Sequence, residues 1–281
     1  MIRAVSLKHT IGMRLGDAAR VLAGTSESAR LDAELLMAHV LGVNRTWLAA
    51  HADETAEAPA FQALIERRAA GEPLAYILGY KDFWTLRLDV TPHVLVPRPE
   101  TELLVELALR DARPSAHVAD LGTGSGAIAL ALANTRPDWH IAATDASAEA
   151  LAVARGNASK LGLRNVEFVL GRWFAPLTSR RFSLIVSNPP YVAENDAALE
   201  SPALQHEPRC ALAAGPDGMA SLSEIIREAP AYLELKGSLL LEHGADQAAA
   251  VSNELVARGF SHVRSHRDLA GHERVTEGQW I

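Results

Sequence analysis

Cysteine is almost absent from the sequence. Its 281 residues include a single one, Cys210, so no disulfide can form within the chain. A lone thiol suits a reducing compartment, and since no neighbouring base marks Cys210 as a nucleophile, we regard it as a small buried residue. Apolar runs of membrane-spanning length are missing, and the first residues lack the charged and then apolar pattern of a signal peptide. We expect a cytoplasmic protein without a membrane anchor.

Basic residues are fewer than acidic residues. The chain has 27 Lys and Arg against 34 Asp and Glu, a formal net charge of −7 and an isoelectric point of about 5.9. Proteins that bind DNA or RNA neutralise many phosphates with basic side chains, so we expect no direct nucleic-acid binding. A hydrophobic content of 48% indicates ample core, and the length suits two domains.

Residues 1–75 carry helical periodicity and no convincing strand. Apolar residues recur at helical spacing in 28–42, and Gly42 is a suitable helix end. Segment 59–71 has a proline near its start and a glycine at its end, as helices do. Short amphipathic helices bury their apolar stripes against one another. We therefore predict a helical bundle, which is either a structural cap or a docking module for a macromolecular substrate.

The segment 76–96 changes to the alternation of polar and apolar residues that is typical of strands, and it predicts a β-hairpin. It leads into PRPETE at 97–102, which is followed by an apolar helix with acidic residues in its first turn. Two interpretations of Arg98 and Glu100 stay open. They form either a solvated helix start or a rigid border of the active site.

Strands and helices alternate from residue 116 onward. Such alternation predicts an α/β fold with a mostly parallel sheet and helices on both faces. The last two strands are joined by a connection too short for a parallel crossover, so one antiparallel edge strand is expected. The predicted strands are 117–121, 140–145, 166–170, 182–187, 239–242, 260–266 and 274–280, and the predicted helices are 126–134, 147–161, 219–233 and 245–258.

A glycine-rich turn joins the first of these strands to its helix. It comprises Gly122, Thr123, Gly124, Ser125 and Gly126. Glycines permit tight bending and a close approach of the backbone to a ligand. Asp145 ends the next strand, at the spacing at which a carboxylate accepts hydrogen bonds from ribose hydroxyls. The unit predicts a site for a nucleoside-containing cofactor, and NAD remains open on this geometry.

The sequence Asn188-Pro189-Pro190-Tyr191 follows the buried strand 182–187, at the strand end where open α/β sheets bind ligands. Two prolines lack N–H donors and have nearly fixed φ, which leaves the carbonyl groups as stiff acceptors. The Asn188 side chain adds an acceptor and a donor, and the Tyr191 ring adds a flat surface. This cluster suits a planar NH2 group. The alternative is a proline-rich turn that merely ends a core strand.

Eight segments carry a resemblance to a known family. They are RLDAELLMAHVLG, GEPLAYILGYKDFW, VPRPETE, DLGTGSGAIALALA, SNPPYV, HEP at 206–208, LLLEHG and ERVTEGQW, and they cover nearly the whole chain. The sequence resembles the class I S-adenosylmethionine-dependent methyltransferases, and within them the peptide chain release factor glutamine N5-methyltransferases. Asn-Pro-Pro-Tyr alone would be shared with adenine-N6 DNA methyltransferases and some RNA methyltransferases. The N-terminal helical module and its hairpin narrow the choice.

The resemblance implies a Rossmann-like methyltransferase domain over 97–281, a β-hairpin linker over 76–96 and an N-terminal helical substrate-docking domain over 1–75. It implies methyl transfer from S-adenosyl-L-methionine to the side-chain nitrogen N5 of the glutamine in the Gly-Gly-Gln motif of peptide chain release factors. The product would be S-adenosyl-L-homocysteine, and the process served would be translation termination. We expect a cytoplasmic monomer whose partners are release factors.

The resemblance also assigns cofactor residues. Gly122 to Gly126 and Asp145 match the cofactor-binding positions, and Trp173 matches the aromatic residue beside the adenine. Without the resemblance, Trp173 would be read as a core aromatic that follows a strand. Arg172 departs from the family, which often has an acidic residue there, and a basic residue cannot accept a hydrogen bond from the adenine amino group.

On the substrate side, Asn188 matches a residue near both cofactor and substrate. Asn188, Pro189, Pro190 and Tyr191 together match the residues that hold the substrate. We expect the Asn188 oxygen and the Pro189 carbonyl to accept the two N–H bonds of the substrate amide, with Tyr191 packed on the amide plane. Glu207 and Glu242 are candidate proton acceptors, although a structural hydrogen-bonding role explains each of them better.

Three other functions stay open. The nearest is a nucleic-acid base methyltransferase that acts on an exocyclic amine, which the acidic isoelectric point disfavours. The others are a nucleotide-binding oxidoreductase and a non-catalytic adaptor built on a cofactor-binding fold. No metal site is predicted: His262 and His266 are four residues apart, but they fall in an expected edge strand, where solvated polar side chains are ordinary.

Overall fold

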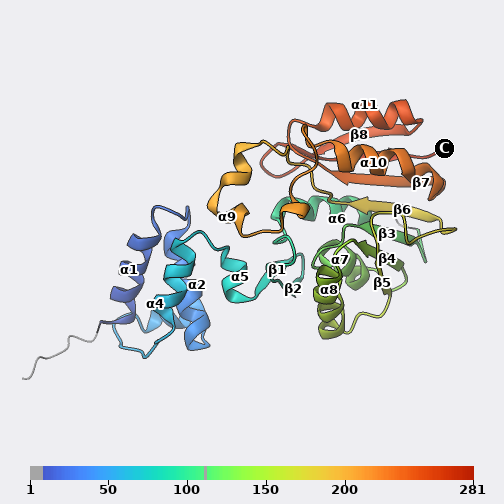
Figure 1. The fold of residues 1–281 in the computed structure, drawn as a ribbon. Helices are drawn as coiled ribbons and strands as arrows, with labels where there is room; N and C mark the ends of the chain where they lie inside the picture. The colour runs from blue at the N-terminus through green and yellow to red at the C-terminus, as the bar shows by residue number, and fades with distance from the viewer. Residues whose placement is uncertain (1–8, 111–112) are drawn as a thin grey trace, which may run out of the picture. The chain divides into compact units, whose positions relative to one another are not determined.

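The structure is a computed structural model, and it describes residues 9–110 and 113–281. The chain forms two compact units that divide between Gly79 and Tyr80. Figure 1 shows the helices and strands of each unit. Within the described residues, no helix is long and apolar enough to cross a membrane.

The first unit is a helical bundle. Thr10 caps its first helix by accepting a hydrogen bond from the Met13 N–H (3.3 Å), and Asn44 caps a later one by accepting from the Trp47 N–H (2.8 Å). Gly42, in the left-handed region, ends the second helix as predicted. The helices are α1 (Ile11–Leu22), α2 (Ala29–Leu41), α3 (Arg45–Ala50), α4 (Phe61–Ala69) and α5 (Leu74–Leu78).

Both helices predicted in this unit are present. Segment 28–42 contains α2, and segment 59–71 contains α4. Their apolar stripes meet those of α1 and α3 in a core of their own. Its fully buried side chains include Ile11, Leu15, Leu22, Leu36, Met37, Leu48 and Ile65.

The second unit opens with the predicted hairpin, in a shortened form. The hairpin was expected over 76–96, but its strands are β1 (Tyr80–Phe83) and β2 (Leu86–Asp89), which pair antiparallel. Residues 76–78 belong to helix α5 instead. Gly79, at φ +80°, ends that helix in the left-handed conformation, so the extended chain begins only after it.

A seven-stranded sheet organises the rest of the second unit. Its order is β5-β4-β3-β6-β7-β9-β8, and every neighbouring pair as far as β7 is parallel. This confirms the predicted α/β fold class. The antiparallel strand is β9, which lies one position in from the edge because it pairs with both β7 and β8. The strands are β3 (His117–Leu121), β4 (His140–Asp145), β5 (Val166–Leu170), β6 (Phe182–Ser187), β7 (Leu233–Glu242), β8 (Ser261–Arg267) and β9 (Glu273–Gln279).

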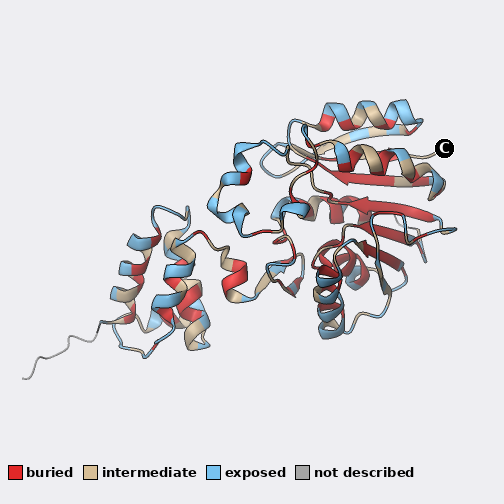
Figure 2. Ribbon diagram, viewed as in Figure 1, coloured by how far each residue is buried: buried red, intermediate tan, exposed pale blue. Residues whose placement is uncertain are grey.

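Helices cover both faces of this sheet (Figure 1). Successive residues of a strand point to opposite faces, so Val118 packs with the first helical layer and Ala119 with the second. Strand β6 is buried over its whole length and β7 over its last four residues (Figure 2). The first layer holds α6 (Glu102–Leu109), α7 (Ala127–Thr135) and α8 (Ala148–Leu161), and the second holds α10 (Ala220–Glu228) and α11 (Ala248–Arg258).

Strand β7 is longer than predicted. The sequence predicted a helix over 219–233 and a strand over 239–242, whereas α10 stops at Glu228 and β7 begins at Leu233. Pro230, in a short 3-10 turn (η4, Ala229–Ala231), ends the helical run early. The remaining short elements are η1 (Pro99–Thr101), η2 (Ala197–Glu200), α9 (Pro202–Gln205) and η3 (Arg209–Ala211).

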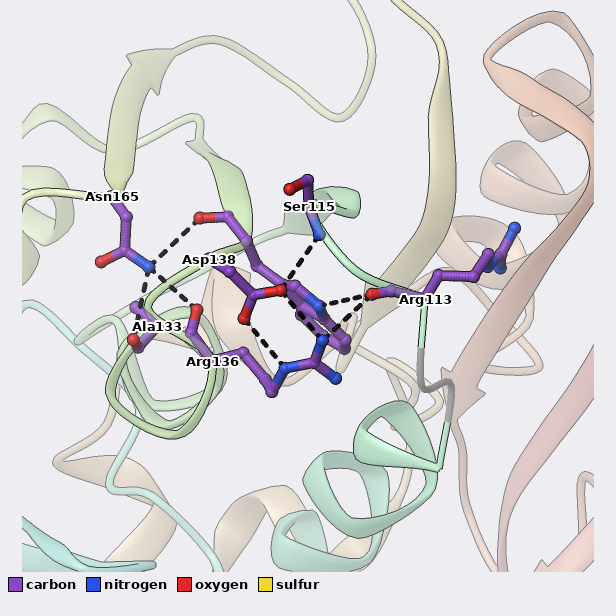
Figure 3. A network of polar contacts seen from close by, with 7 residues as sticks. Arg113, Ser115, Ala133, Arg136, Asp138 and Asn165 are labelled. Carbon is purple, nitrogen blue, oxygen red and sulfur yellow. Dashed lines mark hydrogen bonds and ion pairs between the residues drawn. The ribbon is translucent and has the colours of Figure 1, made fainter.

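A polar network fixes the amino ends of the central strands (Figure 3). Asn165, just before β5, donates through Nδ2 to the backbone oxygens of Ala133, Arg136 and Trp139 at 3.2–3.3 Å. Asp138 accepts from the Ser115 N–H at 3.0 Å. These bonds hold together the connections that enter β3, β4 and β5. The carboxyl ends of these parallel strands lie at the opposite edge of the sheet.

Candidate active site

The strand order reverses at the boundary between β3 and β6. Strands that follow β3 step to one side as far as β5, and strands from β6 onward step to the other side. Loops that leave the carboxyl ends of such strands separate and open a crevice. Gly122 follows β3, Asp145 ends β4 and Asn188 follows β6. The fold therefore brings the predicted cofactor and substrate residues to one edge.

A cleft of about 490 Å³ opens at this edge. Pockets of roughly 300–1,000 Å³ are typical for small-molecule ligands. The walls include Gly122, Gly124, Asp145, Trp173, Asn188 and Pro190. Two groups of residues predicted from separate motifs thus line the same cavity.

The glycine-rich turn has the conformation that its sequence predicted. Gly122 and Gly126 have φ of +74° and +85°, which favours glycine. A Cβ on Gly122 would lie 3.0 Å from the Trp173 ring, and one on Gly126 would lie 2.9 Å from the Leu130 side chain. The turn is therefore free of side chains where it faces Trp173.

Two aspartates hold the turn. Asp145 accepts from the Gly124 N–H through Oδ2 (2.8 Å) and from the Ser147 N–H through Oδ1 (2.9 Å). Asp120, fully buried under the turn, accepts from the Thr123 hydroxyl (2.6 Å) and the Ala129 N–H. Burial raises the pKa of the Asp120 carboxyl to about 7. Ser125 is also buried, so the turn presents Gly122, Gly124 and the Asp145 carboxylate to the cleft.

Trp173 lies against the turn, with φ +46° and only 7% of its surface exposed. Its Nε1 donates to the Glu224 carboxylate (3.2 Å), and Arg172 forms an ion pair with the same carboxylate. The basic residue at position 172 is therefore neutralised by an acidic residue from α10. Sequence spacing gave no sign of this pairing, because 52 positions separate Arg172 from Glu224.

The four residues Asn188 to Tyr191 take different positions. Asn188 and Pro190 line the cleft, and Pro189 is buried. The Tyr191 hydroxyl donates to Glu242 Oε1 (3.4 Å), and its backbone oxygen accepts from Gln247 Nε2 (3.0 Å). Tyr191 is not among the cleft-lining residues, and the packing of its ring on the substrate amide stays a prediction.

Both candidate proton acceptors, Glu242 and Glu207, are buried. Glu242, at the end of β7, is 1% exposed, and burial raises the pKa of its carboxyl to about 7. Glu207 is 6% exposed, forms an ion pair with Arg98 and accepts from the Val96 N–H (3.1 Å). Arg98 is thus paired with a buried carboxylate rather than left solvated at a helix start, while its place at the border of the active site stays a prediction.

Two family models match the sequence. The PrmC N-terminal domain model matches residues 15–79, and the methyltransferase small domain model matches residues 99–205. Curated relatives match over almost the whole length. The release factor glutamine methyltransferase of Pseudomonas aeruginosa is 50% identical over 259 residues, which are 91% of this chain and 94% of that protein. That of Vibrio cholerae is 46% identical over 260 residues, 91% of each chain.

The chain belongs to the release factor glutamine methyltransferase family. Solved methyltransferases share its fold. A methyltransferase from Pyrococcus furiosus superposes with a TM-score of 0.55 at 19% identity, over 78% of this chain and 98% of that one. A 16S rRNA methyltransferase from Thermus thermophilus, in complex with AdoMet and guanosine, gives 0.55 at 18% identity, over 72% and 50%. These likenesses establish the methyltransferase fold of this family member.

Some residues of this methyltransferase site were missed or misjudged from sequence. Thr101 accepts a hydrogen bond from Asn188 Nδ2 (3.1 Å), although the sequence indicated only a helix start there. Cys210 was expected to be buried, but it is exposed and lines the cleft, because it sits on the single turn of η3. Neither position has a sequence signal, since both depend on where segments distant in sequence meet.

Proposed function

We propose that this protein transfers a methyl group from S-adenosyl-L-methionine to the side-chain amide nitrogen of the glutamine in the Gly-Gly-Gln motif of peptide chain release factors. The observation that carries the proposal is the single cleft shared by the glycine turn, Asp145 and Asn188. The name shared by relatives 42–50% identical to the chain supports the substrate.

The chain's own residues fit the cofactor. The bare backbone of Gly122 and Gly124 permits close approach of a ligand, and Asp145 is placed to accept hydrogen bonds from ribose hydroxyls. Trp173 offers an aromatic wall next to the turn. When bound, S-adenosyl-L-methionine supplies a methyl group that is already activated by its sulfonium. The protein then has to bind and orient the cofactor and the substrate, and to exclude water from the site.

The acceptor half of the site fits a planar NH2 group. An amide nitrogen is a weak nucleophile because its lone pair is delocalised into the carbonyl. Asn188 Oδ1 has no hydrogen-bond partner among the described residues, so it is available to accept an N–H from the substrate. The Pro189 carbonyl is the second proposed acceptor. Two fixed acceptors orient the nitrogen toward the methyl group, which is the main contribution that positioning can make.

We further propose that the first unit docks the release factor. All residues that line the cleft lie between His93 and Ser221, within the second unit. The first unit has a core of its own and a separate family match over 15–79. Glutamine side chains are ubiquitous, so contacts away from the reacting amide must select the protein substrate. We propose the first unit as the source of these contacts.

Labelled methyl transfer tests the proposal. The full-length protein would be incubated with S-adenosyl-L-methionine that carries an isotopic methyl label and with one candidate substrate at a time. The candidates are an intact release factor, duplex DNA and RNA. We expect label in the release factor alone. Label in a nucleic acid and none in the release factor would contradict the proposal and indicate a nucleic-acid base methyltransferase. A thermal shift with NADH and none with S-adenosyl-L-homocysteine would indicate an oxidoreductase.

A further inference from the structure

An asparagine on α8 joins the glycine-rich turn to the β-hairpin. Asn157 is 1% exposed, and its Nδ2 donates to the Ser125 oxygen of the turn at 2.9 Å. The same amide pairs with the last residue of β2. Its Oδ1 accepts from the Asp89 N–H at 2.8 Å, and its Nδ2 donates to the Asp89 oxygen at 3.0 Å. One buried side chain thus connects two segments that lie 32 and 68 positions away in the sequence.

The sheet holds only the first part of the glycine-rich turn. Its first two N–H groups donate to the Thr144 oxygen on β4, and the Gly124 N–H donates to Asp145 at the end of that strand. Ser125 is held from the other side. Within the described residues, Asn157 is the only donor to the Ser125 oxygen, and Ser125 is 2% exposed, so water does not readily replace this bond.

The hairpin is a firm support for the Asn157 amide. Phe83, Leu86 and Leu88 are buried in the same core layer as residues of α7 and α8. The Asp89 carboxylate also forms an ion pair with Lys160 on α8. The backbone at the end of β2 is therefore fixed on the side of the helix that carries Asn157.

The part of the turn that Asn157 holds has little stiffness of its own. Ser125 lies between Gly124 and Gly126, which have φ of +57° and +85° and can adopt many other conformations. Without its hydrogen bond, the Ser125 carbonyl would be buried and unpaired, and rotation at the two glycines would relieve this. Such a rotation would move Gly124, which lines the cleft and holds the Asp145 carboxylate through its N–H.

We propose that Asn157 is a positioning residue for the cofactor, and that the β1–β2 hairpin is thereby a structural part of the cofactor site, although none of the described residues 80–89 lines the cleft. Asn157 acts through Ser125 on the neighbouring Gly124 and so on Asp145. The inference deepens the proposed function, on which it rests for the identity of the cofactor.

Calorimetry of a pair of asparagine variants is the first test. Asn157→Ala removes all three bonds, so we expect the affinity for S-adenosyl-L-homocysteine to fall roughly ten-fold, which corresponds to about 1.4 kcal/mol. The matched control is Asn165→Ala, which removes three bonds to backbone oxygens at the opposite edge of the sheet. N165A should lower stability and leave the affinity unchanged. An unchanged affinity in N157A, or an equal loss in both variants, overturns the inference.

Steady-state kinetics and a second control distinguish positioning of the cofactor from general damage. In N157A, the KM for S-adenosyl-L-methionine should rise roughly ten-fold, while kcat and the KM for the release factor change less than about two-fold. Lys160→Met removes the ion pair between α8 and the hairpin but keeps the Asn157 amide. Its KM for the cofactor should stay at the wild-type value. A KM that rises as far in K160M as in N157A would overturn the role of the amide.

Hydrogen exchange of the wild-type protein keeps the inference testable if N157A folds poorly. Because the turn and the hairpin share the Asn157 amide, ordering of the turn by S-adenosyl-L-homocysteine should also slow exchange of the Asp89 N–H. The Ser115 N–H, which donates to Asp138 at the opposite edge, reports general stabilisation. Protection of Asp89 beyond that of Ser115 supports the inference. Equal protection at both positions, or none at Asp89, overturns it.

The same measurements separate failure of this inference from failure of the proposed function. A wild-type protein that binds S-adenosyl-L-homocysteine but methylates no release factor contradicts the proposed function, and calorimetry of N157A still decides the inference. A wild-type protein that methylates the release factor, with an N157A variant of equal cofactor affinity, contradicts the inference alone. A wild-type protein that does not bind S-adenosyl-L-homocysteine contradicts both.

Discussion

Asn188 contacts the substrate amide in the proposed reaction. Asn188→Ala removes an acceptor that fixes the reacting nitrogen, so we expect the single-turnover rate of methyl transfer to fall by ~10²-fold or more. Cofactor affinity should change much less. Asn165→Ala is the matched control, because Asn165 bonds three backbone oxygens at the opposite edge of the sheet. It should lower stability without slowing transfer, and near-wild-type transfer by N188A would refute the proposed role.

Asp145 binds the cofactor in this account and also holds the turn through the Gly124 N–H. Asp145→Ala should weaken S-adenosyl-L-methionine binding by about 1.5–3 kcal/mol, the range for a hydrogen bond to a charged group. Isothermal calorimetry measures the change. Asp138→Ala, at the far edge of the sheet, should leave affinity unaltered. An affinity unchanged in D145A would remove Asp145 from the site.

Single residues show what the sequence could and could not predict. Gly122, Asp145 and Asn188 end or follow predicted strands, so their meeting at one edge followed from strand order. The contact between Asn188 and Thr101 spans 87 positions, and that between Arg98 and Glu207 spans 109. No local pattern encodes such contacts, because they arise only when packed segments meet.

The loop before α10 supports the Asn188–Tyr191 segment. Gly218 has φ +75°, and a Cβ there would lie 2.2 Å from the Tyr191 backbone oxygen. Gly218→Ala should therefore displace Tyr191, lower the stability by roughly 1–3 kcal/mol and slow methyl transfer. Chemical denaturation and single-turnover kinetics measure the two effects.

Gly162→Ala is the control for this element. Gly162 ends α8 at φ +69°, but an added Cβ would meet no atom within 4 Å. It should cost stability through backbone strain without slowing methyl transfer. Equal kinetic effects of G162A and G218A would show that the loop has no specific link to the site.

Element boundaries were harder to predict than element types. The alternation of strands and helices located every strand of the large sheet, and the buried parallel strands β3, β4 and β6 are recognisable as apolar runs. The start of β7 was missed because its first half, LELKG, carries two charged residues and a glycine, and Leu235 and Lys236 are exposed. The position of β9 between β7 and β8 was not predictable either, since a short connection fixes antiparallel pairing but not which strand lies outside.

We expect the first unit to provide substrate specificity and the second unit to carry out the chemistry. A chain that begins at Tyr80, where the second unit starts, should still bind S-adenosyl-L-methionine. It should lose most activity on an intact release factor and much less on a short Gly-Gly-Gln peptide. A start at Tyr76 is unsuitable, because it cuts through α5. Calorimetry and paired assays of both substrates test this.

The activities on the intact release factor and on the short peptide distinguish a docking role of the first unit from a purely structural role. If the shortened chain folds by circular dichroism and both activities fall by the same factor, the first unit is a structural cap and the docking proposal is wrong. A selective loss on the intact release factor supports docking, because the cleft itself lies in the second unit.

The proposed reaction modifies one atom, the side-chain nitrogen of a glutamine. Tandem mass spectrometry of an intact release factor, incubated with the full-length protein and S-adenosyl-L-methionine and then digested, locates the added methyl group directly. We predict one methyl group on the glutamine of the Gly-Gly-Gln peptide, and its loss or strong reduction with Asn188→Ala. A methyl on any other residue, or an unmodified Gly-Gly-Gln peptide beside a methylated nucleic acid, would contradict it.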